Sequence, residues 1–188
     1  MVFVFMALAA SAMEPSFDCA RASNRVEHAL CASEELGELD REAARLYRIA
    51  LDASPAGRQL LVQGQRDFLR DRNGCTESAA PLDDCIRDSY LADIADLRRL
   101  PAAGSDRGGI SSGPIHFHCA GYRDIFVTLF ALPTPQAYIS VPAANEGQPL
   151  VADDENGQHY VGRYATDEIY DARTGRAMLG PTVCTPAQ

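Results

Sequence analysis

Six cysteines are the side chains of this 188-residue sequence with the clearest covalent chemistry, and their spacing favours disulfide bonds over metal binding. None of them forms a C-x-x-C pair, the signature of zinc ribbons and thioredoxin-like redox sites. An even, widely spaced set suits an exported protein, because disulfides persist only in oxidising compartments. Sequence alone does not choose among the connectivities of the first four cysteines. We expect local pairing of these four, Cys19 with Cys31 and Cys75 with Cys85, and a bridge from Cys119 to Cys184 that ties the two ends of the C-terminal half together.

His116 and His118 are the next candidates for metal ligands. Strand alternation places both side chains on one face of an extended segment. Cys119 beside them is better explained by a disulfide, and no third ligand has the spacing of a common zinc site. We therefore expect no metal and no cofactor.

Motifs of the large enzyme classes give no support for catalysis. The chain has no H-E-x-x-H and no G-x-x-x-x-G-K-[ST] sequence, and no spacing of serine, histidine and acidic residues singles out a triad. We expect a protein that is not an enzyme.

The N-terminus resembles an export signal. Residues 1–12, MVFVFMALAASA, are apolar and uncharged, and end in the small-x-small form of a signal-peptidase site. The run is shorter than the ~20 apolar residues of a membrane-spanning helix. We expect a signal peptide over residues 1–12, truncated because its basic n-region is missing, and hence a periplasmic or secreted protein. The alternative is a buried N-terminal strand.

The charge balance limits the class of partner. The formal net charge is −9 and the 17 basic residues include no lysine, which argues against nucleic acid, whose phosphates require clustered basic side chains. An acidic protein is suited to a basic partner, because opposite net charge speeds encounter.

Residues 13–100 are expected to form a helical domain. An apolar stripe recurs at helical spacing from Leu36 to Leu51, after Ser33 as N-cap and before a further helix that ends at Asn73-Gly74. A short helix over residues 23–30 and a last one through Ile86 and Leu97 complete the domain.

A change of composition near residue 100 predicts a second domain of another class. Residues 101–114 are rich in Gly, Ser, Pro and Ala and are expected to be a flexible linker. Residues 115–188 alternate short β-branched and aromatic runs with turn residues, which predicts a small antiparallel β-barrel. The predicted fold is thus two domains, an all-α disulfide-stapled bundle followed by this barrel. We expect them to fold independently and proteases to cut first between Pro101 and Pro114.

The helical half resembles the N-terminal domain of LprI-type lysozyme inhibitors. The resemblance covers residues 16–99 and rests on four cysteines, on Asp40 and Tyr47, on the run Gln65-Arg66-Asp67-Phe68-Leu69-Arg70-Asp71-Arg72, and on Tyr90.

Residues 115–184 resemble the MliC-type inhibitors of c-type lysozyme, which are small disulfide-closed barrels. The matching segments are 117–119, 126–130, 156–160 and 175–179, with Cys184. The family motif Ser-Gly-x-x-Tyr appears here with Asn156 in place of serine, and the family's lysine has no counterpart. Tyr170 stands where the family has an aromatic residue.

The resemblance implies an inhibitor of c-type lysozyme. Lysozyme cleaves glycan between two carboxyl groups, and an inhibitor loop that inserts donors between them blocks the cleft. The residues implied in binding lysozyme are Asn156, Gly157, Tyr160, Arg173 and Arg176, where an asparagine amide replaces the serine hydroxyl and an arginine replaces the lysine. The alternative is a non-catalytic envelope-binding or assembly module that has the same folds without inhibiting lysozyme.

Overall fold

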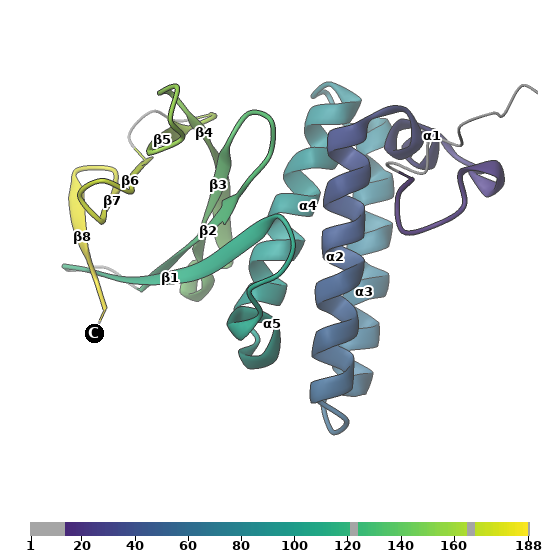
Figure 1. Ribbon diagram of the computed structural model, residues 1–188, viewed down its shortest axis with the longest axis horizontal. Coiled ribbons are helices and arrows are strands. Elements are labelled where there is room, and N and C mark those ends of the chain that lie inside the picture. The colour runs from purple at the N-terminus through teal and green to yellow at the C-terminus, as the bar shows by residue number, and fades with distance from the viewer. Residues whose placement is uncertain (1–13, 121–123, 165–167, 188) are drawn as a thin grey trace, which may run out of the picture.

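The computed structural model describes residues 14–120, 124–164 and 168–187 as a layer of helices packed against a β-barrel (Figure 1). The predicted signal peptide, residues 1–12, lies outside the described residues. Within the described part of the chain, no helix is both long enough and apolar enough to cross a membrane.

The helical layer is built from amphipathic segments that begin at polar caps. Ser33 is the N-cap of α2, and its Oγ accepts a hydrogen bond from the Leu36 N–H at 3.3 Å, as its position in the sequence predicts. The apolar stripe that begins at Leu36 and Leu39 is buried against α4. The helices are α1 (Arg25–Ala32), α2 (Glu34–Ala53), α3 (Arg58–Asn73), α4 (Leu82–Arg98) and α5 (Pro101–Ser105), with short 3-10 turns η1 (Cys19–Arg21) and η2 (Gly74–Glu77).

The barrel is closed and antiparallel, with each strand paired to the next along the chain and β8 paired back to β1. Closure leaves no open sheet edge among these strands. The strands are β1 (Ser111–Cys119), β2 (Ile125–Phe130), β3 (Gln136–Val141), β4 (Glu146–Ala152), β5 (His159–Gly162), β6 (Glu168–Asp171), β7 (Arg176–Leu179) and β8 (Thr182–Pro186), with the 3-10 turn η3 (Pro142–Ala144) between β3 and β4.

Three disulfides form with the predicted pairing, so this prediction is confirmed. Cys19 bonds to Cys31 and Cys75 to Cys85 within the helical layer, and Cys119 bonds to Cys184 across the β1–β8 pair that closes the barrel. No cysteine is free. Three such bridges suit an oxidising compartment.

The prediction of two separate domains, an all-α bundle and a small barrel, is wrong, because the helices and the barrel share a hydrophobic core. Strand β2 buries both of its faces: Ile125 and Val127 point into the barrel, whereas Phe130 packs with the helical core. Leu132, after β2, is buried in that same core, and Tyr138 of β3 packs against it. Helix α4 covers this outer face of the barrel (Figure 1).

The segment expected to be a flexible linker, residues 101–114, contains α5 and the beginning of β1. The glycine at position 109 allows the main chain to pass close to a side chain of α2. Gly109 has a positive φ of 80°, and a Cβ there would overlap the Glu42 carboxylate. Composition alone cannot distinguish this use of glycine from flexibility.

Arg98 connects the helical layer to the barrel. Its side chain is fully buried and donates from Nη2 to Glu42 Oε1 at 3.1 Å and from Nε to Ser111 Oγ at 2.8 Å. It also donates to the main-chain carbonyls of Ala103, Asp106, Gly108 and Ser111. One guanidinium therefore joins α4, α2, the connecting segment and β1.

Replacing Arg98 by alanine should destabilise the whole protein by about 3–5 kcal/mol, because Glu42 would lose one of its two arginine partners and the buried acceptors that Arg98 satisfies would lose their donor. Urea unfolding followed by far-UV circular dichroism and by tyrosine fluorescence measures the effect. Both signals should change in one coincident transition, and the exposed Arg66→Ala control on α3 should stay within ~0.5 kcal/mol of the parent. Two separate transitions in the parent protein would contradict a shared core.

Candidate protein-binding site

Two loops with exposed hydrogen-bond donors lie side by side at one end of the barrel. The register of β5 and β6 sets His159 opposite Asp171, so the turn before β5 and the turn between β6 and β7 leave the sheet together. The Ala172 N–H donates to the Gln158 carbonyl at 2.7 Å and joins the two turns. The structure thus brings the Asn156–Gly157 and Arg173–Arg176 segments, which are separate in the sequence, into one surface.

The first turn, residues 153–158, is held by its own acidic residue. The Asp154 carboxylate accepts hydrogen bonds from the main-chain N–H groups of Gln158 at 2.8 Å and His159 at 3.3 Å. These bonds hold the pKa of Asp154 below its usual range. Gly157 has φ of 59° and lies against Pro135, so a side chain there would be strained and would collide. Asn156 is exposed at the tip.

Tyr160, one of the residues implied in binding lysozyme, is buried in the barrel. Its exposed fraction is 4%, and its ring lies 5.9 Å from that of Tyr170, which in turn packs edge-on against Phe117. Burial raises the pKa of Tyr160. The structure gives Tyr160 and Tyr170 a packing role beneath the loops.

The two arginines of the second turn differ in their partners. Arg173 forms a fork with Asp171, from Nη2 to Oδ2 at 3.0 Å and from Nε to Oδ1 at 3.2 Å. Hydrogen bonds from Arg173, and from the main-chain N–H groups of Thr174 and Arg173, lower the pKa of Asp171 to about 2. Arg176 begins β7 with an exposed side chain, and the structure records no ion pair for it among the described residues.

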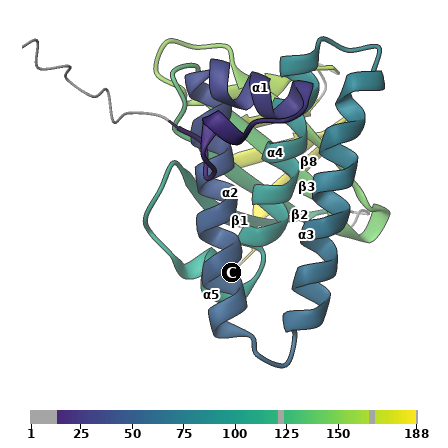
Figure 2. The same cartoon turned by 90° about the vertical axis from the view of Figure 1, so that its right-hand side faces the viewer.

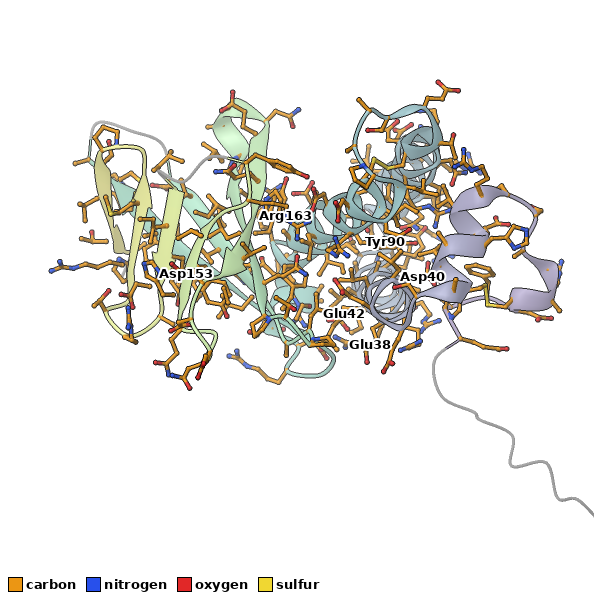
Figure 3. The ribbon with its side chains drawn as sticks, turned by 90° about the horizontal axis from the view of Figure 1, so that it is seen from above. Glu38, Asp40, Glu42, Tyr90, Asp153 and Arg163 are labelled. Atoms are coloured by element: carbon orange, nitrogen blue, oxygen red, sulfur yellow. A yellow bond between two sulfur atoms is a disulfide. The ribbon has the colours of Figure 1, made fainter. Side chains whose placement is uncertain are left out.

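Acidic side chains surround the same surface. His159 Nδ1 contacts Asp153 Oδ1 at 2.5 Å, and Glu155 is exposed. Figure 3 shows Asp153 on the barrel, away from the helices that carry Glu42 and Tyr90. Sequence reasoning missed Asp171 and Gln158 as parts of this surface. Asp171 could have been identified from its spacing to Arg173, which suits a turn in which a carboxylate caps main-chain N–H groups.

Three of the residues on which the LprI resemblance rests, Asp40, Arg72 and Tyr90, form a buried network rather than an exposed site. Tyr90 Oη donates to Asp40 Oδ1 at 2.6 Å, and Arg72 Nη1 donates to Tyr90 Oη at 2.7 Å. The Ser16 N–H donates to the other oxygen of Asp40 at 2.5 Å. Asp40 and Tyr90 lie together in Figure 3. This network ties α2, α3 and α4 and the chain before α1 to one another.

Two further motifs of the sequence have structural explanations. Residues 109–113 have the form G-x-S-x-G, but Ser111 is buried at the beginning of β1 and bonds to Glu42 and Arg98 rather than to a histidine. His116 and His118 share the Asp124 carboxylate, each at 3.0 Å. Among the described residues, no group of three or more His, Cys, Asp or Glu side chains is arranged to hold a metal ion.

Breaking the Arg173–Asp171 fork should raise the pKa of Asp171. In Arg173→Ala the carboxyl loses its largest stabilising hydrogen bonds, so its pKa should rise from about 2 toward its ordinary value, whereas Arg176→Ala should leave it unchanged. Because the folded-state pKa is depressed, its contribution to stability is present above the unfolded pKa and is lost as the pH falls toward 2. Carboxyl NMR titration measures the pKa in each variant; equal pKa values would contradict the fork.

Comparisons of the chain with protein-family models, with curated proteins and with solved structures find no match. The family resemblance therefore rests on the motif residues, and a function has to be argued from the loops themselves.

Proposed function

We propose that this protein is a periplasmic or secreted, non-catalytic inhibitor of c-type lysozyme, and that the paired loops of the barrel enter the glycan cleft. The observation that carries the proposal is the 2.7 Å hydrogen bond from Ala172 to Gln158, with the register beneath it. It sets the two motif segments beside each other, and each contributes exposed donors.

The donors match what a cleft with two carboxyl groups requires. The Asn156 amide offers two N–H donors on a turn whose shape Asp154 and Gly157 maintain. Arg176 offers an exposed cation beside it, while Arg173 is already engaged with Asp171. We therefore assign the lysine's role to Arg176, and to Arg173 the role of shaping its turn.

Charge and compartment support the same partner. The net charge of −9 favours encounter with a basic enzyme. Asp153 and Asp154 are engaged with His159 and with main-chain N–H groups, which leaves Glu155 as the exposed acid at the tip. The three disulfides suit the envelope or the exterior, where lysozyme acts.

Substitution of Asn156 by aspartate should weaken inhibition by at least ~2 kcal/mol, or about 30-fold, because it replaces donors with a like charge facing a carboxylate. Arg176→Ala should weaken inhibition more than Arg173→Ala. The measurement is the inhibition constant of the full chain against a c-type lysozyme, repeated at high salt, which should weaken binding through screening.

The matched control is Asn145→Asp, the same change at an exposed residue in the connection between β3 and β4. It should leave the inhibition constant unchanged. If the parent protein does not inhibit lysozyme at micromolar concentration, the proposal fails and the assembly-module alternative takes its place. If Asn156→Asp inhibits as well as the parent, the loops are not the site.

A further inference from the structure

A groove lined by residues of α2, α3 and α4 lies among the helices. Figure 2 shows how these three helices are arranged. It runs between α3 on one side and α2 and α4 on the other, and has a volume of about 570 Å³. This volume falls in the range of sites for small organic ligands. Its walls are mostly apolar and include Tyr47, Leu61, Phe68, Leu97 and Leu100.

Helix α3 covers this region loosely. Arg72 is the one buried residue that the structure records in α3, and Leu60 is 80% exposed. Leu60, Leu61 and Leu100 also line a second hollow of about 360 Å³ next to the first. An apolar ligand longer than the first hollow could therefore extend into the second.

Gly64 keeps the mouth of the groove open. It lies inside α3, where glycine is unfavourable relative to alanine. A Cβ at this position would meet no atom within 4 Å, so no packing contact requires glycine there. The missing side chain leaves space on the groove side of the helix, where Gly64 is part of the lining.

One carboxylate in the lining lacks a partner. Asp93 Oδ2 is enclosed and makes no hydrogen bond. The other acidic groups of the lining are paired, since Asp96 contacts Arg99 at 3.0 Å and Asp71 contacts Arg70 at 3.0 Å. The Arg72 guanidinium donates a hydrogen bond to the Tyr90 hydroxyl. A buried carboxylate without a donor is costly, and a cationic donor would relieve that cost.

Burial, with a smaller effect from the charge of Asp96, raises the pKa of Asp93 to about 7. The other charged or titratable groups that line the groove are Arg99 directly after α4, Asp71 and Arg72 on α3 and Tyr47 on α2. A bound cation would stabilise the ionised form and lower this pKa.

We propose that the groove binds a small amphiphilic amine, an apolar chain or ring that ends in a primary ammonium group, with Asp93 as its counter-ion. An anionic ligand would meet three acidic side chains in the lining. A guanidinium pairs best with two carboxylate oxygens, whereas a compact ammonium needs only one, and Asp93 is part of the groove lining. This site is separate from the barrel loops and does not depend on lysozyme inhibition.

The test uses the full chain and n-octylamine at pH 8, where the amine is charged and Asp93 is ionised, with n-octanol as the uncharged probe of the same length. Isothermal titration calorimetry should show that the ammonium binds at least about tenfold more tightly than the alcohol. Asp93→Asn should remove that preference, while Asp83→Asn, an exposed aspartate on the same helix, should retain it. Equal affinity for both probes, or an unchanged preference in Asp93→Asn, would overturn the proposal.

A second variant tests the location without touching the acid. Gly64→Leu should fill the mouth of the groove and abolish binding of both probes, with a melting temperature at or above that of the parent. In the parent, n-octylamine should lower the NMR-detected pKa of Asp93. Unchanged binding in a folded Gly64→Leu protein would place the ligand elsewhere and overturn the assignment.

Discussion

The buried guanidinium of Arg98 is the interaction on which the rest of the structure depends. A buried cation is tolerated only where its donors meet acceptors and its charge meets an opposite charge. Arg98 meets both conditions, but its acceptors come from α2, from the segment after α5 and from β1. Burial alone would raise the pKa of Glu42, yet hydrogen bonds from Arg45 and Ser111 and the charges of Arg45 and Arg98 lower it overall. The acceptors that compensate the buried Arg98 guanidinium come together only when the helices and the barrel are assembled.

The outer face of the barrel also depends on contact between the helices and the barrel. Strand β2 carries apolar side chains on both faces and β3 adds Tyr138 to the outer one, and a solitary barrel can bury only its interior. Helix α4 covers the second face, and the contact is completed at its polar edge. There Arg163, directly after β5, pairs with Asp88 at 3.2 Å and donates to Gln136 at 2.8 Å. Figure 3 shows Arg163 on the helix side of the barrel. One side of the barrel is therefore covered by the helices.

This contact separates the two proposed binding surfaces. The paired loops belong to strands β5 to β7, which lie away from the helices in Figure 1, and the Cys119–Cys184 bridge closes the barrel beside them. The groove of Asp93 lies among α2, α3 and α4. A loop site on a closed barrel gains a fixed shape, because the register of β5 and β6 leaves each turn little freedom. The helical groove is formed instead by incomplete packing of α3.

Local features of the chain could be predicted from its sequence, because they depend on neighbouring residues. The N-cap at Ser33, the apolar stripe of α2 and the pairing of nearby cysteines are of this kind. Features that join distant residues were decided by tertiary structure. The sequence motif at 156–160 identified an exposed turn but could not show that Tyr160 points into the barrel or that Asp171 holds Arg173. The glycine-rich segment 101–114 was mistaken for a flexible linker, because the close approach of Gly109 to Glu42 exists only once both halves have packed. Composition says which residues are present. Their burial and their partners depend on which distant residues the fold places beside them.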